Sequence, residues 1–287
     1  MSSPDAWTSW PAPAKLNLFL HIVGRRADGY HRLQTVFQIL DWGDTVRLRV
    51  RDDAIIRREG EIAGVAAEND LCVRAARALR ECVPGASGVD IAIGKRIPIG
   101  GGLGGGSSDA ATTLVALNAL WGTALPVDDL AQIGLRLGAD VPVFVRGFSA
   151  WAEGVGEQLT PIELPGRDYV LVDPGAAVPT APLFQAAELT RNCAPTTIES
   201  FLAGAATSNV FAPVVRARFP AVAQALDWLG RFGDARLSGS GGCIFAAVES
   251  AAQADEIVRN CPAPWRAWRA RGVNRSPLAA ALARFGV

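Results

Sequence analysis

The sequence predicts an α+β protein built from two domains, and three observations support that prediction. Alternating apolar and polar residues predict several strands before residue 95, and no parallel strand–helix–strand repeat surrounds the glycine run that follows them. That run, at 100–106, stands between a short strand and an apolar helical pattern. Glycines and acidic residues then cluster at 152–164. This shift in composition places the domain boundary between residues 1–155 and residues 156–287.

The first part of the chain reads as strands and one helix. Residues 1–12 are expected to form a loose arm, and the charged, irregular segment 51–66 suggests a polar hairpin. Asn69 or Asp70 suits the N-cap of a helix that ends before Pro84. Alternation predicts strands at 14–22, 33–40, 46–50 and 89–93, with a turn at 41–44.

The first predicted strand has an unusual polar face. Its two sides alternate, with Leu16, Leu18, Leu20 and Ile22 on one and Lys15, Asn17, Phe19 and His21 on the other. One interpretation is an edge strand whose polar side faces solvent. The other is that Lys15 and Asn17 line a functional site, and the pattern alone leaves both open.

The glycine run predicts a phosphate-binding loop. Six of the seven residues from Gly100 to Gly106 are glycine, and ordering glycine is costly in backbone entropy. The run leads directly into Ser107 and Ser108, either of which could cap a helix. A loop of bare N–H groups that ends at a helix N-terminus is an anion site, usually for phosphate.

The common nucleotide templates fit this loop poorly. Gly100, Gly102 and Gly105 satisfy G-x-G-x-x-G, but such a match is nearly automatic here, and Asp128 and Asp129 belong to a predicted helix. The P-loop template requires a lysine where this chain has Gly106. A flexible linker is disfavoured, because a capping serine and an amphipathic helix follow at once.

Two helices and a buried strand are predicted after the loop. Helical spacing relates Ala110, Leu114, Leu117 and Trp121. A second helix opens at Asp128 and ends at Gly138, which suits the C′ position. Asp140 then precedes the apolar run 141–145, which is predicted as a strand. Asp140 could be a helix cap, an ion-pair partner or a catalytic group.

The C-terminal part is predicted to form a smaller α+β unit. Tyr169 begins a strand, and several helical stretches follow as far as Trp228. A second small-residue turn, Leu237 to Cys243, is either an ordinary connection between strands or part of a site. A helix at 250–259 and a strand at 267–273 complete the unit.

Composition excludes several classes of protein. The net charge is zero, so a nucleic-acid partner is not expected. No apolar run is long enough to span a membrane, and the first residues lack the features of a secretion signal, which predicts a cytoplasmic location. The five cysteines are scattered without C-x-x-C spacing, and two histidines make a histidine-built metal site improbable.

The stretch PIGGGLGGGSSDAAT resembles the phosphate loop of the GHMP small-molecule kinases. Three further stretches, PAPAKLNLFLHIVGRRADGYHRLQTVFQ, LGADVPVFVRG and LSGSGGCIFA, resemble one branch of that family. The substrate of this branch is a cytidine-diphosphate-linked methylerythritol of the non-mevalonate isoprenoid pathway. The likeness extends from about Trp10 to the C-terminal GVNRSPL.

The resemblance implies a fold, a reaction and a set of site residues. The fold is a ribosomal-protein-S5-like N-terminal domain and a ferredoxin-like C-terminal domain, and the reaction is phosphorylation of the substrate 2-hydroxyl by ATP with Mg²⁺. Lys15 and Asp140 would be the catalytic pair. The substrate would contact Asn17, Tyr30, His31, Thr180 and Phe184. ATP would contact Lys95, Pro98, Ile99, Gly100, Gly101, Gly102, Leu103, Gly104, Gly105, Gly106, Ser107 and Ser108. The protein would be a monomer or a weak homodimer, and the metal ligands stay unassigned.

Three other functions remain to be distinguished. A GHMP kinase that acts on a different small alcohol is disfavoured by Tyr30, His31 and Phe184. A non-catalytic phosphate-binding module would not need both Lys15 and Asp140. A dinucleotide oxidoreductase is disfavoured because no parallel strand–helix–strand repeat surrounds the loop.

Overall fold

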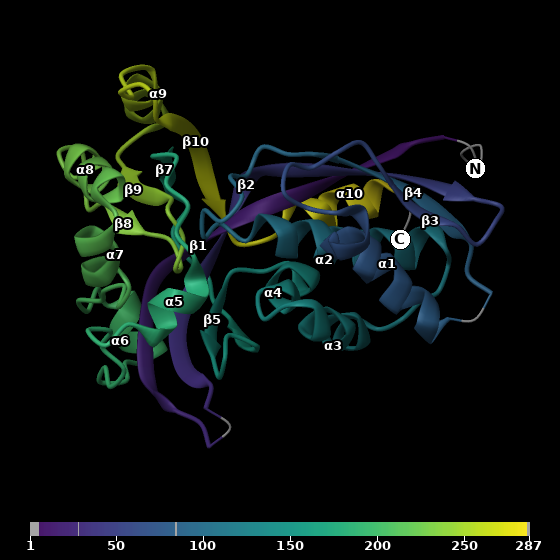
Figure 1. Ribbon diagram of the computed structural model, residues 1–287, viewed down its shortest axis with the longest axis horizontal. Helices are drawn as coiled ribbons and strands as arrows, with labels where there is room; N and C mark the ends of the chain where they lie inside the picture. Colours follow the sequence, from purple (N-terminus) through teal and green to yellow (C-terminus); the bar gives the residue numbers. More distant parts are fainter. Residues whose placement is uncertain (1–5, 28, 84, 286–287) are drawn as a thin grey trace.

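A long antiparallel hairpin runs through the whole molecule and joins its two ends (Figure 1). In this computed structural model the described residues are 6–27, 29–83 and 85–285. The hairpin consists of β1 (Thr8–Arg25) and β2 (His31–Arg51). Strands of both halves extend from β2 in the order β3-β4-β2-β10-β7-β9-β8, while β1 and β5 also pair with β2 and β6 pairs with β5.

The hairpin corrects two predictions about the start of the chain. The expected loose arm is wrong for residues 8–12, because β1 already begins at Thr8 and the Trp10 side chain is buried. The arm's first five residues lie outside the described residues. The turn predicted at 41–44 is also absent, since β2 continues through it and Gly43 lies against the backbone of Ala12. Polar residues and a glycine within an uninterrupted strand produce the same local pattern as a turn.

Two more strands and a helix flank the hairpin at its N-terminal end. The polar hairpin suggested at 51–66 is wrong, because β3 (Ile56–Glu59) pairs in parallel with β4 (Gly88–Gly94). The capped helix is confirmed as α1 (Leu71–Cys82), whose N-cap Asp70 accepts a hydrogen bond from the Cys72 N–H. A short 3₁₀ turn, Ala67–Asn69, precedes that cap.

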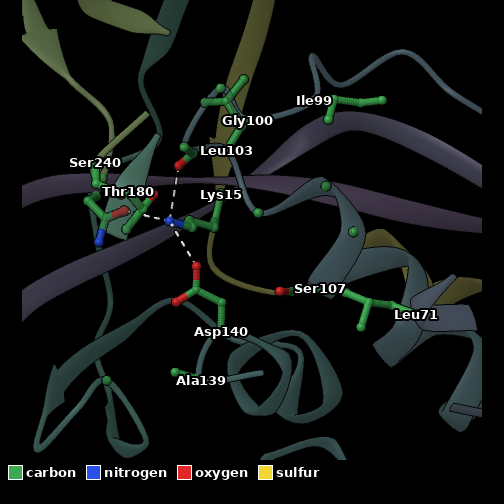
Figure 2. A pocket seen from close by; sticks show the side chains of 18 of the residues that line it. Lys15, Leu71, Ile99, Gly100, Leu103, Ser107, Ala139, Asp140, Thr180 and Ser240 are labelled. Atoms are coloured by element: carbon green, nitrogen blue, oxygen red, sulfur yellow. Dashed lines mark hydrogen bonds and ion pairs between the residues drawn. The ribbon is translucent and has the colours of Figure 1, made fainter. Parts of the chain in front are cut away.

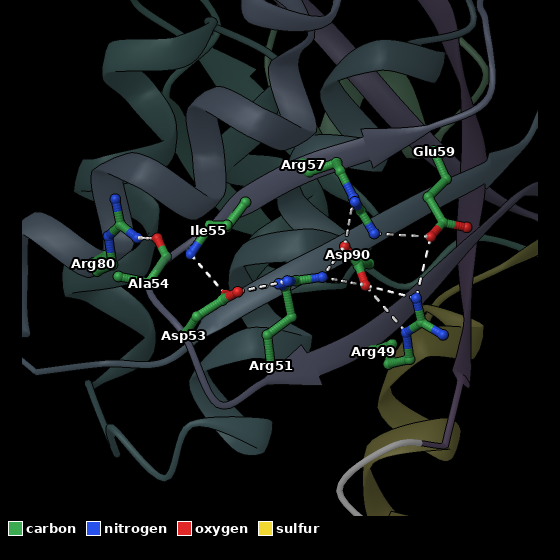
Figure 3. A network of polar contacts seen from close by, with 9 residues as sticks. All are labelled: Arg49, Arg51, Asp53, Ala54, Ile55, Arg57, Glu59, Arg80 and Asp90. Carbon is green, nitrogen blue, oxygen red and sulfur yellow. Dashed lines mark hydrogen bonds and ion pairs between the residues drawn. The ribbon is translucent and has the colours of Figure 1, made fainter.

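A buried carboxylate ties β2, β3 and β4 together (Figure 3). Asp90 of β4 is fully buried and accepts hydrogen bonds from three arginines, Arg49, Arg51 and Arg57. Burial alone would raise the pKa of Asp90, but these charge-assisted hydrogen bonds outweigh it and lower the pKa. Asp90 therefore stays ionised and compensates the positive charge of the surrounding strands.

Replacing Asp90 with asparagine is expected to lower the free energy of unfolding by roughly 2 kcal/mol at pH 7, because the arginines lose their buried partner. A carboxylate with a depressed folded pKa stabilises above its unfolded pKa of about 3.9 and loses that contribution as pH falls through the folded value. Urea unfolding at pH 7 and below pH 4 should therefore show that wild type and Asp90→Asn differ less in their free energy of unfolding in acid. The control Asp53→Asn removes an exposed partner of Arg51, and because exposed ion pairs contribute little to stability, it should cost clearly less than Asp90→Asn. Equal costs for both variants would contradict the assigned role.

Three helices follow the glycine run; the first packs on β1 and β2, and the other two pack against that helix (Figure 1). The N-cap expected at Ser107 or Ser108 is wrong, because α2 (Gly105–Leu120) begins earlier and its N-cap is Gly104. The helix predicted from Asp128 is confirmed as α3 (Val127–Leu137). The strand predicted at 141–145 is wrong, since this run forms α4 (Val141–Arg146) with a proline in its first turn. An all-apolar run has no periodicity that separates a helix from a strand.

The other half of the molecule is the smaller α+β unit expected from the sequence. The strand beginning near Tyr169, the helix at 250–259 and the strand at 267–273 are confirmed. Its strands are β7 (Asp168–Asp173), β8 (Arg236–Leu237), β9 (Ile244–Val248) and β10 (Arg266–Val273). Its helices are α5 (Thr180–Gln185), α6 (Ile198–Leu202), α7 (Ala212–Arg218), α8 (Pro220–Leu229) and α9 (Ala251–Arg259).

Strand β1 contributes to the cores of both halves, and the C-terminal helix returns to the first core. Trp10 and Ala12 of β1 pack in the core formed with α1 to α4, whereas Leu20 and Ile22 of the same strand pack in the core of the other half. The C-terminal α10 (Pro277–Phe285) returns to the first core through Leu278. The short strands β5 (Ala150–Glu153) and β6 (Gln158–Pro161) lie at the connection, so the boundary at 155 stays a prediction. Among the described helices, none has the length and apolarity needed to cross a membrane.

Candidate active site

A cavity of about 660 Å³ lies where β1, the glycine run, α5 and the start of α4 meet. Many of the predicted site residues lie in its wall. Those residues are Lys15, Asn17, Lys95, Pro98, Ile99, Gly100, Gly101, Gly102, Leu103, Gly104, Gly105, Gly106, Ser107, Asp140, Thr180 and Phe184. Residues that are distant in the sequence therefore share one cavity.

Lys15 lines this cavity and points toward Asp140 (Figure 2). Its Nζ is 3.3 Å from Asp140 Oδ2 and donates hydrogen bonds to Asn17 Oδ1 at 2.5 Å and to the Gly102 carbonyl at 3.1 Å. The Lys15 side chain is 3% exposed, whereas that of Asp140 is 35% exposed. The ammonium is thus fixed by three acceptors, and the carboxylate remains accessible to a ligand.

The polar face of β1 is not solvated, so that interpretation of the first strand is wrong. In the sheet β1 pairs with β2, and Leu20 also forms an isolated bridge with Asn209, while Lys15 and Asn17 are both buried and line the cavity. Asn17 Nδ2 donates to Thr35 Oγ1 on β2 at 2.9 Å, which orients its amide. The strand therefore supplies a rigid polar wall to the cavity.

Asp140 owes its position to the helix that the sequence did not predict. It occupies the N-cap position of α4 with φ −86°, but its side chain makes no capping hydrogen bond. Of the three roles left open for it, the helix cap is excluded, and the ion pair with Lys15 is present. Because the Asp140 carboxylate makes no hydrogen bond to the helix N-terminus, it can face a ligand.

The glycine run packs directly on the second small-residue turn. Gly100, Gly102 and Gly104 have positive φ values of 74°, 78° and 75°. A Cβ on Gly102 would lie 2.0 Å from the Ser238 carbonyl oxygen, and one on Gly241 would lie 2.1 Å from the Gly102 nitrogen. Side chains at these positions would separate the two turns. The second turn is thus a support for the first and more than an ordinary connection.

Hydrogen bonds fix the two turns against each other and against β1. Ser238 Oγ donates to the Gly102 carbonyl at 3.0 Å and accepts from the Asn17 N–H at 3.3 Å. The Cys243 N–H donates to the Gly101 carbonyl at 3.1 Å. The first turn of α2 follows, and Gly105, Gly106 and Ser107 line the cavity. A rigid loop that leads into a helix N-terminus suits a phosphate.

Lys95 provides a second, partly buried ammonium beside this loop. Its Nζ contacts Asp44 and lies 2.8 Å from Asp109 Oδ2. Burial lowers the pKa of Lys95, but attraction to Asp109 and Asp44 outweighs it, so the pKa is raised and the charge is kept. Burial, reinforced by the neighbouring carboxylates of Asp44 and Asp70, raises the pKa of Asp109 to about 7 despite Lys95.

Lys15 and Lys95 are the only lysines in the sequence, which otherwise uses arginine for its positive charge. Both line the cavity. A lysine carries a compact charge with three donors, whereas the arginine fork is larger and planar. The two positions where the chain uses lysine are therefore the two that face the cavity beside the glycine run.

The predicted substrate residues lie at the α5 end of the cavity, with two exceptions. Thr180 Oγ1 is 2.7 Å from Ser240 Oγ, and both residues line the cavity with Phe184. The His31 ring stacks on Phe184 at 5.2 Å but is not part of the wall, and Tyr30 is 66% exposed outside it.

The predicted ATP contact Ser108 also lies outside the cavity wall. Its side chain is fully buried on α2, behind Ser107. Its Oγ has no hydrogen-bond partner among the residues the structure describes. The structure therefore brings Ser107, and not Ser108, to the cavity surface.

Several cavity residues were not predicted. Thr35 carries no sequence signal, because its role follows from its pairing with Leu20 across the hairpin. Ser240 could have been found from the second glycine turn, whose Ser238 supports the glycine run without lining the cavity. The sequence also did not predict four further residues of the cavity wall, Ile62, Val65, Leu71 and Cys72. Ile62 and Val65 belong to the charged, irregular segment 51–66, whose local sequence carries no sign of a site.

Known protein families match both halves of the chain. The family described as GHMP kinases N terminal domain matches residues 70–148, and the one described as GHMP kinases C terminal matches residues 187–267. The chain belongs to the GHMP kinase family. A member of this family is a phosphotransferase, and ATP is its co-substrate.

Relatives and solved structures place the chain within the GHMP kinases. It is 59% identical over 282 residues to a 4-diphosphocytidyl-2-C-methyl-D-erythritol kinase of Xanthomonas campestris pv. campestris (strain B100), covering 98% of this chain and 96% of the relative. The kinase of the same name from Halorhodospira halophila is 57% identical, covering 96% and 97%.

Solved GHMP kinases share the architecture described above. A crystal structure of 4-(cytidine 5'-diphospho)-2C-methyl-D-erythritol kinase has a TM-score of 0.80 at 33% identity, covering 93% of this chain and all of that one. The Methanococcus jannaschii mevalonate kinase has a TM-score of 0.65 at 18% identity, covering 94% of this chain and 99% of its own, and shares the fold alone. The predicted two-domain GHMP kinase fold is thereby confirmed.

Proposed function

We propose that this protein transfers the γ-phosphoryl group of ATP to the 2-hydroxyl of 4-diphosphocytidyl-2-C-methyl-D-erythritol, which gives the 2-phosphate and ADP. One observation carries the proposal. The Lys15–Asp140 pair lies in a cavity between the glycine run and the Phe184 end, in a chain whose relatives at 57–59% identity bear the name of that kinase. The geometry leaves room for a phosphate donor on one side of the pair and an acceptor on the other.

The glycine run would bind the ATP phosphates. Its support by the second turn fixes the loop before ATP arrives, which reduces the entropy lost on binding. The N-terminus of α2 directs its unpaired N–H groups and its positive dipole end toward the loop. Lys95 beside Gly105 would add a cation that the loop itself lacks. The adenosine would extend toward α1, where Leu71 and Cys72 line the cavity.

The donor set fits a magnesium ion carried on the ATP phosphates. Among the described residues, no group of three or more histidines, cysteines or acidic residues could hold a metal. Mg²⁺ instead commonly keeps water and binds through substrate phosphates with one or two protein oxygens. Ser107 lines the cavity. Its Oγ lies near Gly138, two residues before Asp140, since a Cβ built on Gly138 would be 3.7 Å from that Oγ. Ser107 would therefore hold the ion, which would neutralise phosphate charge.

Asp140 and Lys15 would perform the transfer step. Phosphoryl transfer passes through a loose transition state, so orientation and charge stabilisation matter more than a strong base. The accessible Asp140 carboxylate would orient the acceptor hydroxyl and accept its proton. Lys15, fixed by Asn17 and Gly102, would stabilise the migrating phosphoryl charge without reorganising.

The cytidine end of the substrate would bind beside α5. Phe184 presents an aromatic ring to the cavity, and His31 stacks on that ring from outside the wall. Tyr30 would have to move toward the cavity to contact the base, because it is exposed on the hairpin. Thr180 and Asn17 would provide hydrogen bonds to the diphosphate and methylerythritol parts.

Several broader assignments accompany this proposal. Residues 1–155 would carry the ATP side and residues 156–287 the acceptor side, although β1 belongs to both cores and Asn17, Tyr30 and His31 of the first domain would also face the acceptor. The enzyme would act in the cytoplasm as a monomer or weak homodimer, without a nucleic-acid partner, which the zero net charge supports.

A substrate panel tests the proposal. The protein is mixed with ATP, Mg²⁺ and one alcohol at a time, and ADP release is measured together with the ³¹P spectrum of the product. The cytidine-diphosphate methylerythritol should give a kcat/KM at least about 10²-fold above mevalonate, homoserine or galactose. Comparable turnover of any of these three alcohols would contradict the proposed substrate and leave only the family assignment.

A further inference from the structure

Helix α5 contributes two residues, Thr180 and Phe184, to the cavity wall, but it is too short to be stable by itself. It has six residues, Thr180–Gln185, and helices of this length are unstable without tertiary contacts. Its final carbonyl groups have no partner within the helix. After Gln185 the chain turns into an extended conformation at Ala186. The position of Phe184 in the cavity wall therefore depends on a group outside α5.

Arg191 supplies that group. Its Nη2 donates to the Phe184 carbonyl at 2.9 Å and to the Ala186 carbonyl at 2.8 Å, and its Nη1 donates to the Leu189 carbonyl at 3.0 Å. The planar guanidinium thus closes the loop that follows α5. A positive charge is also favourable at a helix C-terminus, where the carbonyl groups are unpaired.

The ring of Phe184 is enclosed by other aromatic groups. It stacks on His31 at 5.2 Å with 26° between the planes, and it meets Phe211 edge-on at 4.9 Å and 79°. Both Phe184 and Phe211 line the cavity. Because Arg191 fixes the Phe184 backbone, it also fixes the ring that faces the cavity.

The charge of Arg191 also affects His31, which stacks on Phe184. Burial lowers the pKa of His31, and repulsion by the Arg191 and Arg25 guanidinium groups lowers it further. Arg25 faces His31 across the β1–β2 hairpin, Arg191 approaches from the loop after α5, and Phe184 covers the ring. The imidazole is therefore neutral near pH 7.

We propose that Arg191 is a positioning residue for the nucleobase end of the acceptor site. It acts through Phe184 and His31 and does not touch the acceptor itself. The inference rests on the proposed function, because it assigns the Phe184 end of the cavity to the cytidine group. It predicts that Arg191 controls acceptor affinity and has little influence on the transfer step.

Arg191→Met removes the three hydrogen bonds and the charge. The KM for the cytidine substrate should rise about tenfold, while kcat stays within about threefold and the KM for ATP is unchanged. The control Arg218→Met removes an arginine that contacts the same segment only through exposed Glu188, and it should leave all three constants unchanged. A KM within twofold of wild type, or a loss confined to kcat, would overturn the proposal.

A double-mutant cycle separates positioning from general loosening. If Arg191 acts through Phe184, then Arg191→Met should raise the KM much less in a Phe184→Ala background than in the wild type. Fully additive effects would show that the two residues act independently, and they would refute the mechanism. Arg191→Lys retains the charge without the guanidinium fork, so a wild-type KM in that variant would also refute it.

A substrate-free measurement distinguishes this inference from the proposed function. The sequence has two histidines, His21 and His31, so their ring signals can be assigned with a single His31→Gln variant and titrated by NMR. Arg191→Met should move the His31 midpoint upward, whereas Arg191→Lys should leave it near the wild-type value. An unchanged midpoint in Arg191→Met would show that Arg191 does not lie beside the His31–Phe184 pair, whatever the substrate is.

Discussion

Asp140→Asn is expected to lower kcat at least about 10²-fold, because the amide can still contact the acceptor hydroxyl but cannot take its proton. The substitution keeps the size of the side chain, and Asp140 makes no capping hydrogen bond that α4 would lose. The glycine run and the N-terminus of α2 remain intact, so ATP should bind with nearly unchanged affinity. Steady-state kinetics and calorimetric titration with a non-hydrolysable ATP analogue measure the two quantities.

Asp128→Asn is the matched control for this variant. Asp128 lies in the first turn of α3 and pairs with Arg146 at 2.8 Å, on the exposed side of the same helical layer. Its replacement removes a carboxylate and an ion pair without altering the cavity, so kcat should not change. A kcat for Asp140→Asn within a few-fold of wild type would remove Asp140 from the transfer step and leave it a structural partner of Lys15.

The sequence predicted the chemistry of the site better than its surroundings. The glycine run could be found because so many glycines in a row carry an entropic cost that needs a reason. The Lys15–Asp140 pairing came from family resemblance, since 125 positions separate the two residues and no local pattern joins them. The structure supplies the contact, a 3.3 Å ion pair, that the sequence could not.

The errors have a common physical origin. In each mispredicted segment, long-range contacts override the local sequence pattern. Trp10 lies in a segment without a clear pattern, yet it is buried because α10 and the N-terminal core cover it. The run 141–145 is apolar at every position, so burial on all sides left no period to distinguish α4 from a strand. Ile62 and Val65 became cavity residues only through packing with distant segments.

The positioning role of Arg191 was also beyond the reach of the sequence. Its three hydrogen bonds go to backbone carbonyls, which every residue possesses, so no residue type in the nearby sequence indicates the contact. The predicted substrate residues Thr180 and Phe184 depend on it because α5 is too short to hold them alone. Side chains that touch a ligand carry a recognisable chemistry, whereas the groups that fix those side chains often do not.

Lys15→Met is expected to reduce kcat by about 10² to 10³-fold, the range seen when one fixed donor to a developing negative charge is removed. Methionine fills most of the volume of lysine but leaves Asn17 Oδ1 without the Lys15 donor, whereas the Gly102 carbonyl keeps its hydrogen bond from Ser238 Oγ. Asn17 is buried, so the free energy of unfolding should also fall, by about 1 to 3 kcal/mol. Kinetics and urea unfolding of the same preparation separate the two effects.

Lys95→Met provides the comparison that the chain itself offers, since Lys15 and Lys95 are its only lysines. Lys95 lies beside Gly105 and is bound by Asp44 and Asp109, away from Asp140. Its loss should raise the KM for ATP more than it lowers kcat, because it would contact the phosphates of bound ATP equally before and during transfer. If both variants lost kcat and ATP affinity to the same extent, the two ammonium groups would form one electrostatic unit, and the assignment of the transfer step to Lys15 would be wrong.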